Sequence, residues 1–333
     1  MTSKRLKFKL LMMILILIVL GLVILNLALG QIQLSLNDLL KVLLLQGNKI
    51  QNYVLFNVRL PRLLIVFFSG VALSMSGSLL QSISRNDLAD PGIIGINAGA
   101  GLGVTVFFLM FVHQAKTFAY VLPLVAFLGG LISAFFIFIL SRDKNKGIHP
   151  YKMILIGVGF SMAASGLMVL LITTGERDQV QFITNWLAGN VWGGDWPYVL
   201  VTIPIIILAI IYLAFQTQTL NIIQLGEHHA IGLGVHMKRK QVTYLVVATI
   251  LASISVAVVG NIAFIGLLSP HIAKGMVGIR NQRFLPVAGL IGGILMLVSD
   301  LIARNLIEPN GIPTGILVAM IGAPYFIYLI LKK

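Results

Sequence analysis

The sequence has no cysteine and very little charge. None of its 333 residues is Cys, and Asp, Glu, Lys and Arg together make up 10% of the chain. The first absence excludes disulfides, thiolate metal sites and a Cys nucleophile. The second excludes a soluble domain, where roughly a quarter of the residues are charged. With 58% hydrophobic residues and a mean hydropathy of +0.98, the composition predicts a protein that crosses a membrane many times.

Nucleotide and metal motifs are missing as well. No segment matches G-x-x-x-x-G-K-[ST], and the dinucleotide fingerprint is not matched by GAGLG at 99–103, so ATP hydrolysis of that kind is excluded. There is no H-E-x-x-H motif either. Because His228, His229 and His236 lie in a basic loop with few oxygen ligands, no metal site is expected there.

Nine apolar runs are long enough to cross about 30 Å of hydrocarbon. A tenth, at 264–279, is shorter and contains Pro270 and His271. The first run exceeds the roughly 7–15 apolar residues of a signal peptide, which favours a retained first span. The nine longer runs are 10–29, 61–83, 93–112, 118–140, 153–173, 197–216, 242–262, 286–304 and 313–331.

The distribution of Lys and Arg supports ten spans. With the N-terminus in the cytoplasm, 17 of the 24 Lys and Arg residues fall on the cytoplasmic side and 7 outside, the bias usual in membrane proteins. If 264–279 were not counted as a span, Lys332 and Lys333 would lie outside and the bias would be weaker. We therefore predict an all-α membrane protein with ten transmembrane helices, both termini cytoplasmic, and one domain over 1–333. The basic charge follows this topology and does not indicate nucleic-acid binding.

Small residues recur at every fourth position of several runs, as at Gly95, Gly99 and Gly103. Little hydrophobic force acts between helices in lipid, so such faces allow the close backbone approach that drives packing. We interpret them as packing faces, with lining of a pathway as the alternative. Similar spacing occurs at Gly70, Ser74 and Ser78; Gly157, Ser161 and Ser165; and Gly315, Ala319 and Ala323.

Two polar positions inside the runs are candidates for a structural or pathway role. His271 follows Pro270, and Asp300 lies four residues before Arg304, where the two can pair on one helix face. Ionisable groups are costly in lipid and suggest function, although a packing pair near the interface explains them equally well. Only ten Asp and Glu occur in the chain, which disfavours a proton relay.

The segment 217–241 is too long and too patterned for a simple turn. Its apolar residues have the spacing of short amphipathic helices interrupted by glycines, which predicts a cytoplasmic docking surface. A membrane protein with such a surface and no ATPase motif suggests a separate motor subunit.

These motifs together resemble the FecCD-like type II family, the iron-siderophore and vitamin B12 permeases of bacterial ABC importers. The similarity covers essentially the whole chain. It rests on RLPR at 59–62, Gln81 with RNDLADP at 85–91, GINAGAGLG at 95–103, LGEHHAIGLG at 225–234, GNIAFIGLLSPHIAK at 260–274, DLIAR at 300–304 and IPTGILVAMIGAPYF at 312–326.

The resemblance implies a permease of the bacterial cytoplasmic membrane, paired with a second permease subunit, as a homo- or heterodimer. Two ATPase subunits and an extracytoplasmic substrate-binding protein complete the importer. ATP and Mg would bind the ATPases, and no cofactor would bind the permease. A ferric siderophore is the expected substrate, and the NDLADPGIIGINAGAG variant is most similar to hydroxamate-type permeases. Cobalamin or haem are same-family alternatives, and an ion-coupled secondary transporter is the alternative of another class.

The resemblance also implies roles for single residues. Asn86 and Leu88 would line the cytoplasmic gate. Arg59, Arg62 and Arg304 would lie at the outer mouth and dock carboxylates of the binding protein. For Arg59 and Arg62 the alternative is anchoring of a helix end at the headgroups. The ATPase-coupling residues would be Leu225, Gly226, Glu227, Ala230, Leu233 and Gly234.

Two positions depart from the family pattern. The usual Pro after the gate Asn is Asp87 here, which is expected to tune the gate or to mark one partner of a heterodimer. The usual Glu before the I-P-x-G motif is Gly311, and Glu308 is a candidate substitute for that acid.

Overall fold

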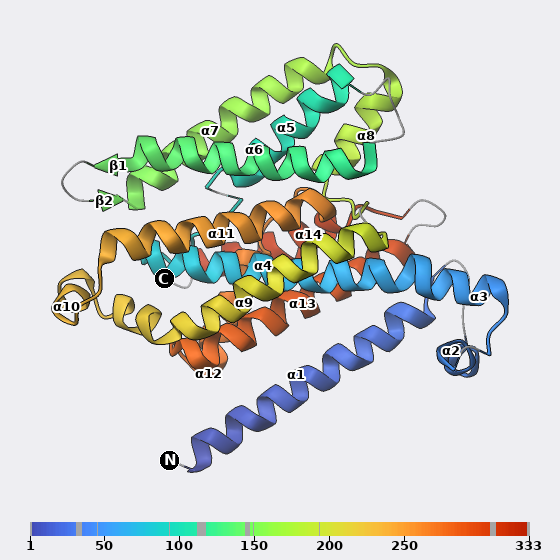
Figure 1. The fold of residues 1–333 in the computed structure, drawn as a ribbon, viewed down its shortest axis with the longest axis horizontal. Coiled ribbons are helices and arrows are strands. Elements are labelled where there is room, and N and C mark those ends of the chain that lie inside the picture. Colours follow the sequence, from blue (N-terminus) through green and yellow to red (C-terminus); the bar gives the residue numbers. More distant parts are fainter. Residues whose placement is uncertain are drawn as a thin grey trace.

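The structure is a computed structural model that describes residues 2–30, 35–44, 46–92, 94–111, 118–143, 147–148, 150–192, 194–306 and 311–331 (Figure 1). Almost all of these residues are helical. The helices are α1 (Thr2–Ala28), α2 (Leu36–Leu43), α3 (Lys49–Tyr53), the π-helix η1 (Val54–Arg59), α4 (Leu60–Ser84), α5 (Ile96–Phe111), α6 (Phe118–Ser141), α7 (Pro150–Ile172), α8 (Arg177–Leu187), α9 (Trp196–Gln224), α10 (Glu227–Gly232), α11 (Met237–Val259), α12 (Ile265–Val277), α13 (Asn281–Leu306) and α14 (Thr314–Leu331). Two two-residue strands, β1 (Arg142–Asp143) and β2 (Gly147–Ile148), pair antiparallel between α6 and α7.

A helix occupies each of the ten predicted ranges. Within the described residues, seven helices are long and apolar enough to cross a membrane, counting α3, η1 and α4 as one helix over Lys49–Ser84. Shorter apolar helices cover 96–111 and 314–329, and α12 has 13 residues. The protein is therefore a multi-helix membrane protein, and the number of crossings stays a prediction.

Helix α4 lies at the centre of the molecule, in contact with α13, α11, α12 and α9 (Figure 1). Its small residues allow this approach: a Cβ added to Gly70 would overlap the backbone of Gly292 on α13, and one added to Gly77 would overlap the backbone of Gly266 on α12. The Ser74 hydroxyl donates a hydrogen bond to the Ala288 carbonyl of α13 at 2.7 Å. Helix α4 is thus in close backbone contact with α13 and with α12.

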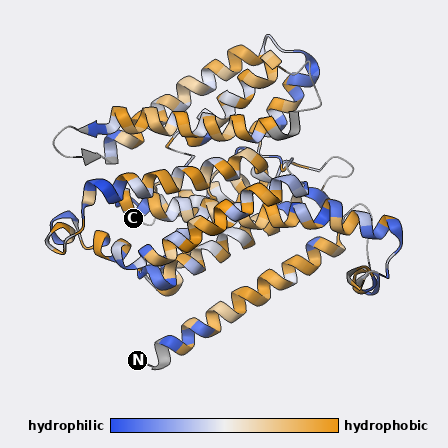
Figure 2. Cartoon of the chain, viewed as in Figure 1, coloured by the Kyte–Doolittle hydropathy of each residue, from blue (hydrophilic) through white to orange (hydrophobic). Residues whose placement is uncertain are grey.

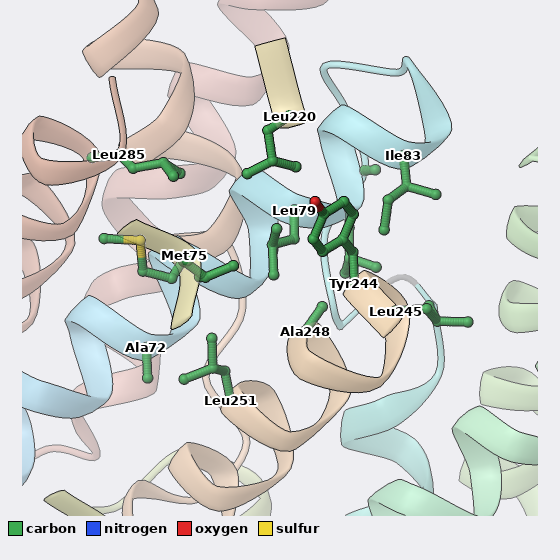
Figure 3. Packing of buried hydrophobic residues seen from close by; sticks show 14 of the residues in the cluster. Ala72, Met75, Leu79, Ile83, Leu220, Tyr244, Leu245, Ala248, Leu251 and Leu285 are labelled. Carbon is green, nitrogen blue, oxygen red and sulfur yellow. The ribbon is translucent and has the colours of Figure 1, made fainter. Parts of the chain in front are cut away.

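An apolar core fills the rest of the space around α4. Figure 3 shows Met75 and Leu79 of α4 near Leu220 of α9, Tyr244 of α11 and Leu285 of α13. All five side chains are at most 5% exposed. Helices from distant parts of the sequence therefore share one core.

Helices α5 to α8 form a second group, drawn at the top of Figure 1. Within it α5 contacts α6, α7 and α8, and α11 provides most of the contact with the central group. Helix α1 crosses the opposite side and leaves most of its apolar residues exposed, as expected for a helix that faces lipid.

Polar residues gather at the two ends of the helices, and apolar residues cover the length between (Figure 2). The start of α1, the end of α14, α10 and the β1–β2 hairpin all lie toward one end (Figure 1). This arrangement agrees with termini on one side, although which side stays a prediction. Several lysines counted in that topology lie outside the described residues: Lys116, Lys144, Lys146, Lys332 and Lys333.

Only part of the segment 217–241, which was predicted to be a cytoplasmic docking surface, connects two helices. Helix α9 continues to Gln224, because Leu220 and Ile223 are buried in the core and extend its apolar face. One short helix, α10, then connects it to α11. Helices α2 and α8 were not predicted.

Adding a methyl group at Gly77 tests the contact between α4 and α12. We expect Gly77→Ala to destabilise the protein by about 1–3 kcal/mol, the usual cost of overpacking, because the new Cβ meets backbone that cannot move aside. The control is Gly21→Ala in α1, where a Cβ meets nothing within 4 Å. The measurement is the thermal unfolding midpoint of the purified full chain in detergent. Equal midpoints for the two variants would contradict the packing argument.

Candidate functional site

The predicted gate residues lie in a tight turn over residues 85–89 that follows α4. It is called the gate turn after that prediction. Arg85 ends the helix in the left-handed conformation, with φ 51°. The Asn86 side-chain oxygen accepts the backbone N–H of Leu88 at 3.0 Å, and the Asn86 carbonyl accepts that of Ala89 at 3.1 Å. Asn commonly stabilises turns in this way. The turn leaves Leu88 partly buried and Ala89 1% exposed.

A second turn leads from this position into α5. The carboxylate of Asp90, 4% exposed, accepts the backbone N–H of Gly92 at 2.8 Å. Gly95 has φ 86°, a conformation that favours glycine, and an added Cβ would meet the Ile137 side chain at 2.8 Å. Hydrogen bonds within the two turns and contact with α6 thus hold residues 85–92 and Gly95 in place.

Gly99 and Gly103 lie on the face of α5 that meets α6. A Cβ on Gly99 would overlap Ser133, and one on Gly103 would meet the Val125 carbonyl oxygen at 3.1 Å. Both glycines therefore allow the close contact between α5 and α6. A role in lining a pathway stays a prediction.

A cavity of about 730 Å³ opens beside the second turn. Asp90 borders it at the turn, Asn97 from α5, Ser161 and Ser165 from α7, and Phe264 from the start of α12. Most of the lining is apolar, with these few polar groups, as is typical of binding sites for organic molecules.

Two lining residues have unusual geometry. Phe264 has φ 68°, a left-handed conformation that is costly for a bulky residue. Its ring centroid lies 6.3 Å from that of Phe326 on α14. Asn97 donates to the Asn261 side-chain oxygen at 2.8 Å, while its own Oδ1 is buried with no hydrogen-bond partner within the described part of the chain. Strain and an unsatisfied polar atom are common at functional sites.

Pro270 and His271 lie in α12, close to the gate turn. Pro270 is buried inside the helix, and the His271 ring lies edge-on to Tyr325 of α14, with 5.9 Å between ring centroids. His271 therefore takes part in the contact between α12 and α14.

Arg59, one of the predicted docking residues, is 6% exposed. Its Nη1 donates to the carbonyl oxygens of Leu27 at 2.5 Å and Ala28 at 3.1 Å. The last carbonyls of a helix have no partner within the helix, and a cation is favourable there. Arg59 thus holds the end of α1 against η1. Its role in docking, or in anchoring a helix end at the headgroups, stays a prediction.

Arg62 and Arg304 meet on the carboxylate of Asp300, whose side chain is 2% exposed. Arg62 Nη2 lies 2.8 Å from Asp300 Oδ1, and Arg304 Nε lies 3.0 Å from Oδ2, the ion pair expected from the i,i+4 spacing. Thr314 Oγ1 donates to Oδ1 at 3.2 Å, and Arg304 Nη2 donates to the Asn26 side-chain oxygen at 2.8 Å. Arg62, Asp300 and Arg304, with Asn26 and Thr314, are called the outer arginine cluster after the predicted topology. The cluster joins α1, α4, α13 and α14.

Helix α10 presents the predicted ATPase-coupling residues. It begins after Gly226, which has φ 119°, and only Ala230 of the coupling set is buried. Leu225 and Leu233 are 63% and 62% exposed. Glu227 is exposed and borders a groove of about 510 Å³ whose other walls carry Gly234, His236, Lys238 and Arg239.

The departure at Gly311 has a conformational reason. Gly311 has φ 66°, and the next backbone N–H, of Ile312, donates to the Ala303 carbonyl at 2.9 Å. A glutamate would be strained at this turn. The candidate substitute acid, Glu308, lies outside the described residues. Within the described chain, no three His, Cys, Asp or Glu residues are grouped as metal ligands.

The sequence profile of the FecCD transport family matches residues 15–332. The chain belongs to the FecCD transport family. It is 36% identical over 311 residues to the iron(3+)-hydroxamate import system permease protein FhuG of Bacillus subtilis, covering 92% of each chain. It is 38% identical over 280 residues to the Fe(3+) dicitrate transport system permease protein FecD of Escherichia coli, covering 84% of this chain and 86% of that protein. A solved structure of a metal-chelate type ABC transporter in an inward-facing conformation has a TM-score of 0.84 at 30% identity, covering 97% of this chain and 99% of that one.

In this FecCD family member, the residues predicted for gating, docking and coupling lie in separate places: the gate turn, the outer arginine cluster with Arg59 at the end of α1, and α10 with its flanking residues. The sequence reasoning missed Asn26 and Thr314, which complete the outer cluster. Asn26 is a polar residue in a long apolar run, and that is a signal which could have identified it.

Replacing Asp300 should destabilise the outer cluster. Asp300→Asn leaves Arg62 and Arg304 without a compensating charge, and loss of one partner of a buried pair costs about 3–5 kcal/mol. The control, Asp178→Asn on exposed α8, should change stability by no more than about 0.5 kcal/mol. Unfolding midpoints of the purified proteins measure the difference. A midpoint for Asp300→Asn equal to that of the control would show that the pairing contributes little.

Proposed function

We propose that the chain is the transmembrane permease of a bacterial ABC importer that carries ferric siderophores, with the hydroxamate type favoured. The observation that carries this proposal is the family match over nearly the whole chain, together with relatives named for iron(3+)-hydroxamate and ferric dicitrate import. The permease has no ATPase motif, so a partner subunit would bind ATP and Mg and hydrolyse the nucleotide.

The proposed topology has ten spans, with both termini in the cytoplasm of a bacterial plasma membrane. It is supported by the ten helices in the predicted ranges and by the basic residues at the end that carries α10. The gate turn follows α4 at that same end, and the outer arginine cluster lies at the other (Figure 1).

The surface of α10 suits an ATPase subunit. Exposed Leu225 and Leu233 offer apolar contact area beside the charged groove that Glu227 borders. Protein interfaces combine such an apolar centre with a polar rim. Coupling through α10 would transmit movement of the ATPase to α9 and α11, the two helices that it connects.

A second permease subunit would complete the pathway. Helix α7 is largely exposed, with Leu155 and Met162 each more than 70% accessible, and it borders the cavity through Ser161 and Ser165. We propose that this cavity is one half of the pathway and that a partner permease forms the other half. The substrate would arrive from an extracytoplasmic binding protein docked near Arg62 and Arg304, whose side chains are 25% and 20% exposed.

Ion-coupled transport is the less favoured mechanism. A coupling carboxylate must gain and lose its ion, and such groups usually mark the ion pathway. Asp300 instead pairs with two arginines, and Asp90 accepts a backbone N–H. These acids serve as structural groups in this fold.

Reconstituted transport tests the proposal. The permease is coexpressed with the ATPase and binding-protein genes beside its own, purified as a complex and placed in proteoliposomes. We expect ATP-dependent uptake of a ferric hydroxamate, with weaker or no uptake of ferric citrate, haem and cobalamin. Uptake of haem or cobalamin alone would show that the substrate is one of these same-family alternatives and not a ferric siderophore. Uptake driven by an ion gradient without ATP would refute the ABC mechanism.

Reversing the charge on α10 should loosen the ATPase. We expect Glu227→Arg to weaken the permease–ATPase complex, because losing a charged contact buried in an interface costs about 2–5 kcal/mol. Copurification of the tagged permease with the ATPase provides the measurement, and Asp178→Arg, on exposed α8, is the control. Full recovery of the ATPase together with normal substrate-stimulated hydrolysis would argue against this role of Glu227.

A further inference from the structure

Lys274 on α12 contacts the end of α4 and the gate turn at the same time. Its ammonium nitrogen lies 2.9 Å from the side-chain oxygen of Gln81 and 2.7 Å from the carboxylate of Asp87. The two partners are 193 and 187 residues away in the sequence. The turn that carries Leu88 is therefore joined to α12 by a charged side chain.

Two side chains hold the Lys274 side chain in place: Gln81, which is itself fixed, and Phe284. Gln81 is 2% exposed, and its amide nitrogen donates to the Gly266 carbonyl at 3.4 Å at the start of α12. The Lys274 nitrogen also lies 5.5 Å from the ring centroid of Phe284 on α13, a cation–π distance. Because these contacts fix the ammonium group, its bond to Asp87 fixes the position of the turn.

We propose that Asp87 and Lys274 form a latch that holds the gate turn against α12 and keeps the inner end of the pathway closed between transport cycles. Both are positioning residues: they act through Leu88 and Ala89, the neighbours of Asp87 in the turn. The assignment of this turn as the gate rests on the proposed function. The contacts that hold the turn are independent of it.

The exposure of the pair suits a contact that must break. The side chain of Asp87 is 53% exposed and that of Lys274 is 18% exposed, so water screens their attraction. In the outer cluster, by contrast, the shared carboxylate is 2% exposed. A partly exposed ion pair can orient a turn without preventing it from opening.

The latch also gives a physical meaning to the departure at position 87. Proline would fix its own φ, stiffen the turn from within and offer no charge. Asp87 leaves the backbone freer and adds a tether to another helix. In this chain an ionic contact to α12 would thus replace local backbone rigidity.

The absence of cysteine allows a direct test by labelling. The reporter is Ala89→Cys, because Ala89 is 1% exposed in this turn, and the accessibility control is Arg280→Cys, at an exposed site between α12 and α13. Labelling rates with a membrane-impermeant maleimide are measured on the full chain in lipid nanodiscs. In each reporter background, Lys274→Met, Asp87→Asn and the two together are compared.

The matched control is Lys240→Met. Lys240 also bonds a glutamine, Gln216, at 2.8 Å and lies 5.9 Å from the ring of Tyr244, but it belongs to α11 and its hydrogen bond is to α9, not to the gate turn. Its replacement removes a similar set of contacts. It should leave the labelling rate at position 89 unchanged.

We expect Lys274→Met and Asp87→Asn each to raise the labelling rate at position 89 about two- to fivefold, the range for a partly exposed ion pair. The double variant should rise no further than the larger single one, because both remove the same contact. The exchanged pair, Asp87→Lys with Lys274→Asp, should restore slow labelling. The rate at position 280 should stay constant throughout.

Unchanged labelling in Asp87→Asn, a folded protein by gel filtration, would overturn the latch, as would additive effects of the two substitutions. Asp87 is half exposed, so its replacement by Asn should not prevent folding even if that of Lys274 does. Labelling reports the turn itself and not transport. Failure of every iron chelate to be transported would therefore refute the proposed function and leave the labelling result standing.

Discussion

Close backbone contact around α4 is the interaction on which the rest of the structure depends. Lipid offers little hydrophobic force between helices, so stability comes from packing and from hydrogen bonds that satisfy polar groups internally. Gly70 and Gly77 let α13 and α12 approach to backbone distance. Hydroxyls on the same helix bond carbonyls of its neighbours, Ser74 to α13 and Ser76 to α11. A larger residue at these positions would separate α4 from α13 and α12, the helices that carry Asp300 and Lys274.

The same helix places two charged clusters of different strength. Near the beginning of α4, Arg62 reaches a buried carboxylate that a second arginine also contacts, and such a cluster cannot separate cheaply. At the other end, Gln81 holds Lys274 beside a half-exposed partner. Burial decides the difference, because the same charges interact more weakly where water reaches them. In the proposed topology, the outer end would then be a permanent clamp and the inner end a contact that can break.

Hydropathy and residue spacing predicted the helices well, because each helix in lipid is recognisable from its own composition. They also predicted the pairing of Asp300 with Arg304, which requires only one helix turn. They could not predict that Arg62 shares this carboxylate or that Lys274 meets Asp87, since those contacts depend on how distant helices pack. Arg59 illustrates the same limit. The family resemblance predicted a docking role at the outer mouth, and nothing in the sequence indicated that the Arg59 side chain bonds the carbonyl oxygens of Leu27 and Ala28 at the end of α1.

The location of the cavity follows from the division into two helix groups. Helices α5 and α7 line one side through Asn97, Ser161 and Ser165, and the start of α12 and α14 line the other through Phe264 and Phe326. The central group is held by backbone contact around α4, whereas the two groups meet mainly through α11. A cavity at such a boundary can change volume while both groups keep their internal packing. The chain passes from α4 of one group to α5 of the other directly after the turn at 85–89, so a change in that cavity would act on the turn proposed as the gate.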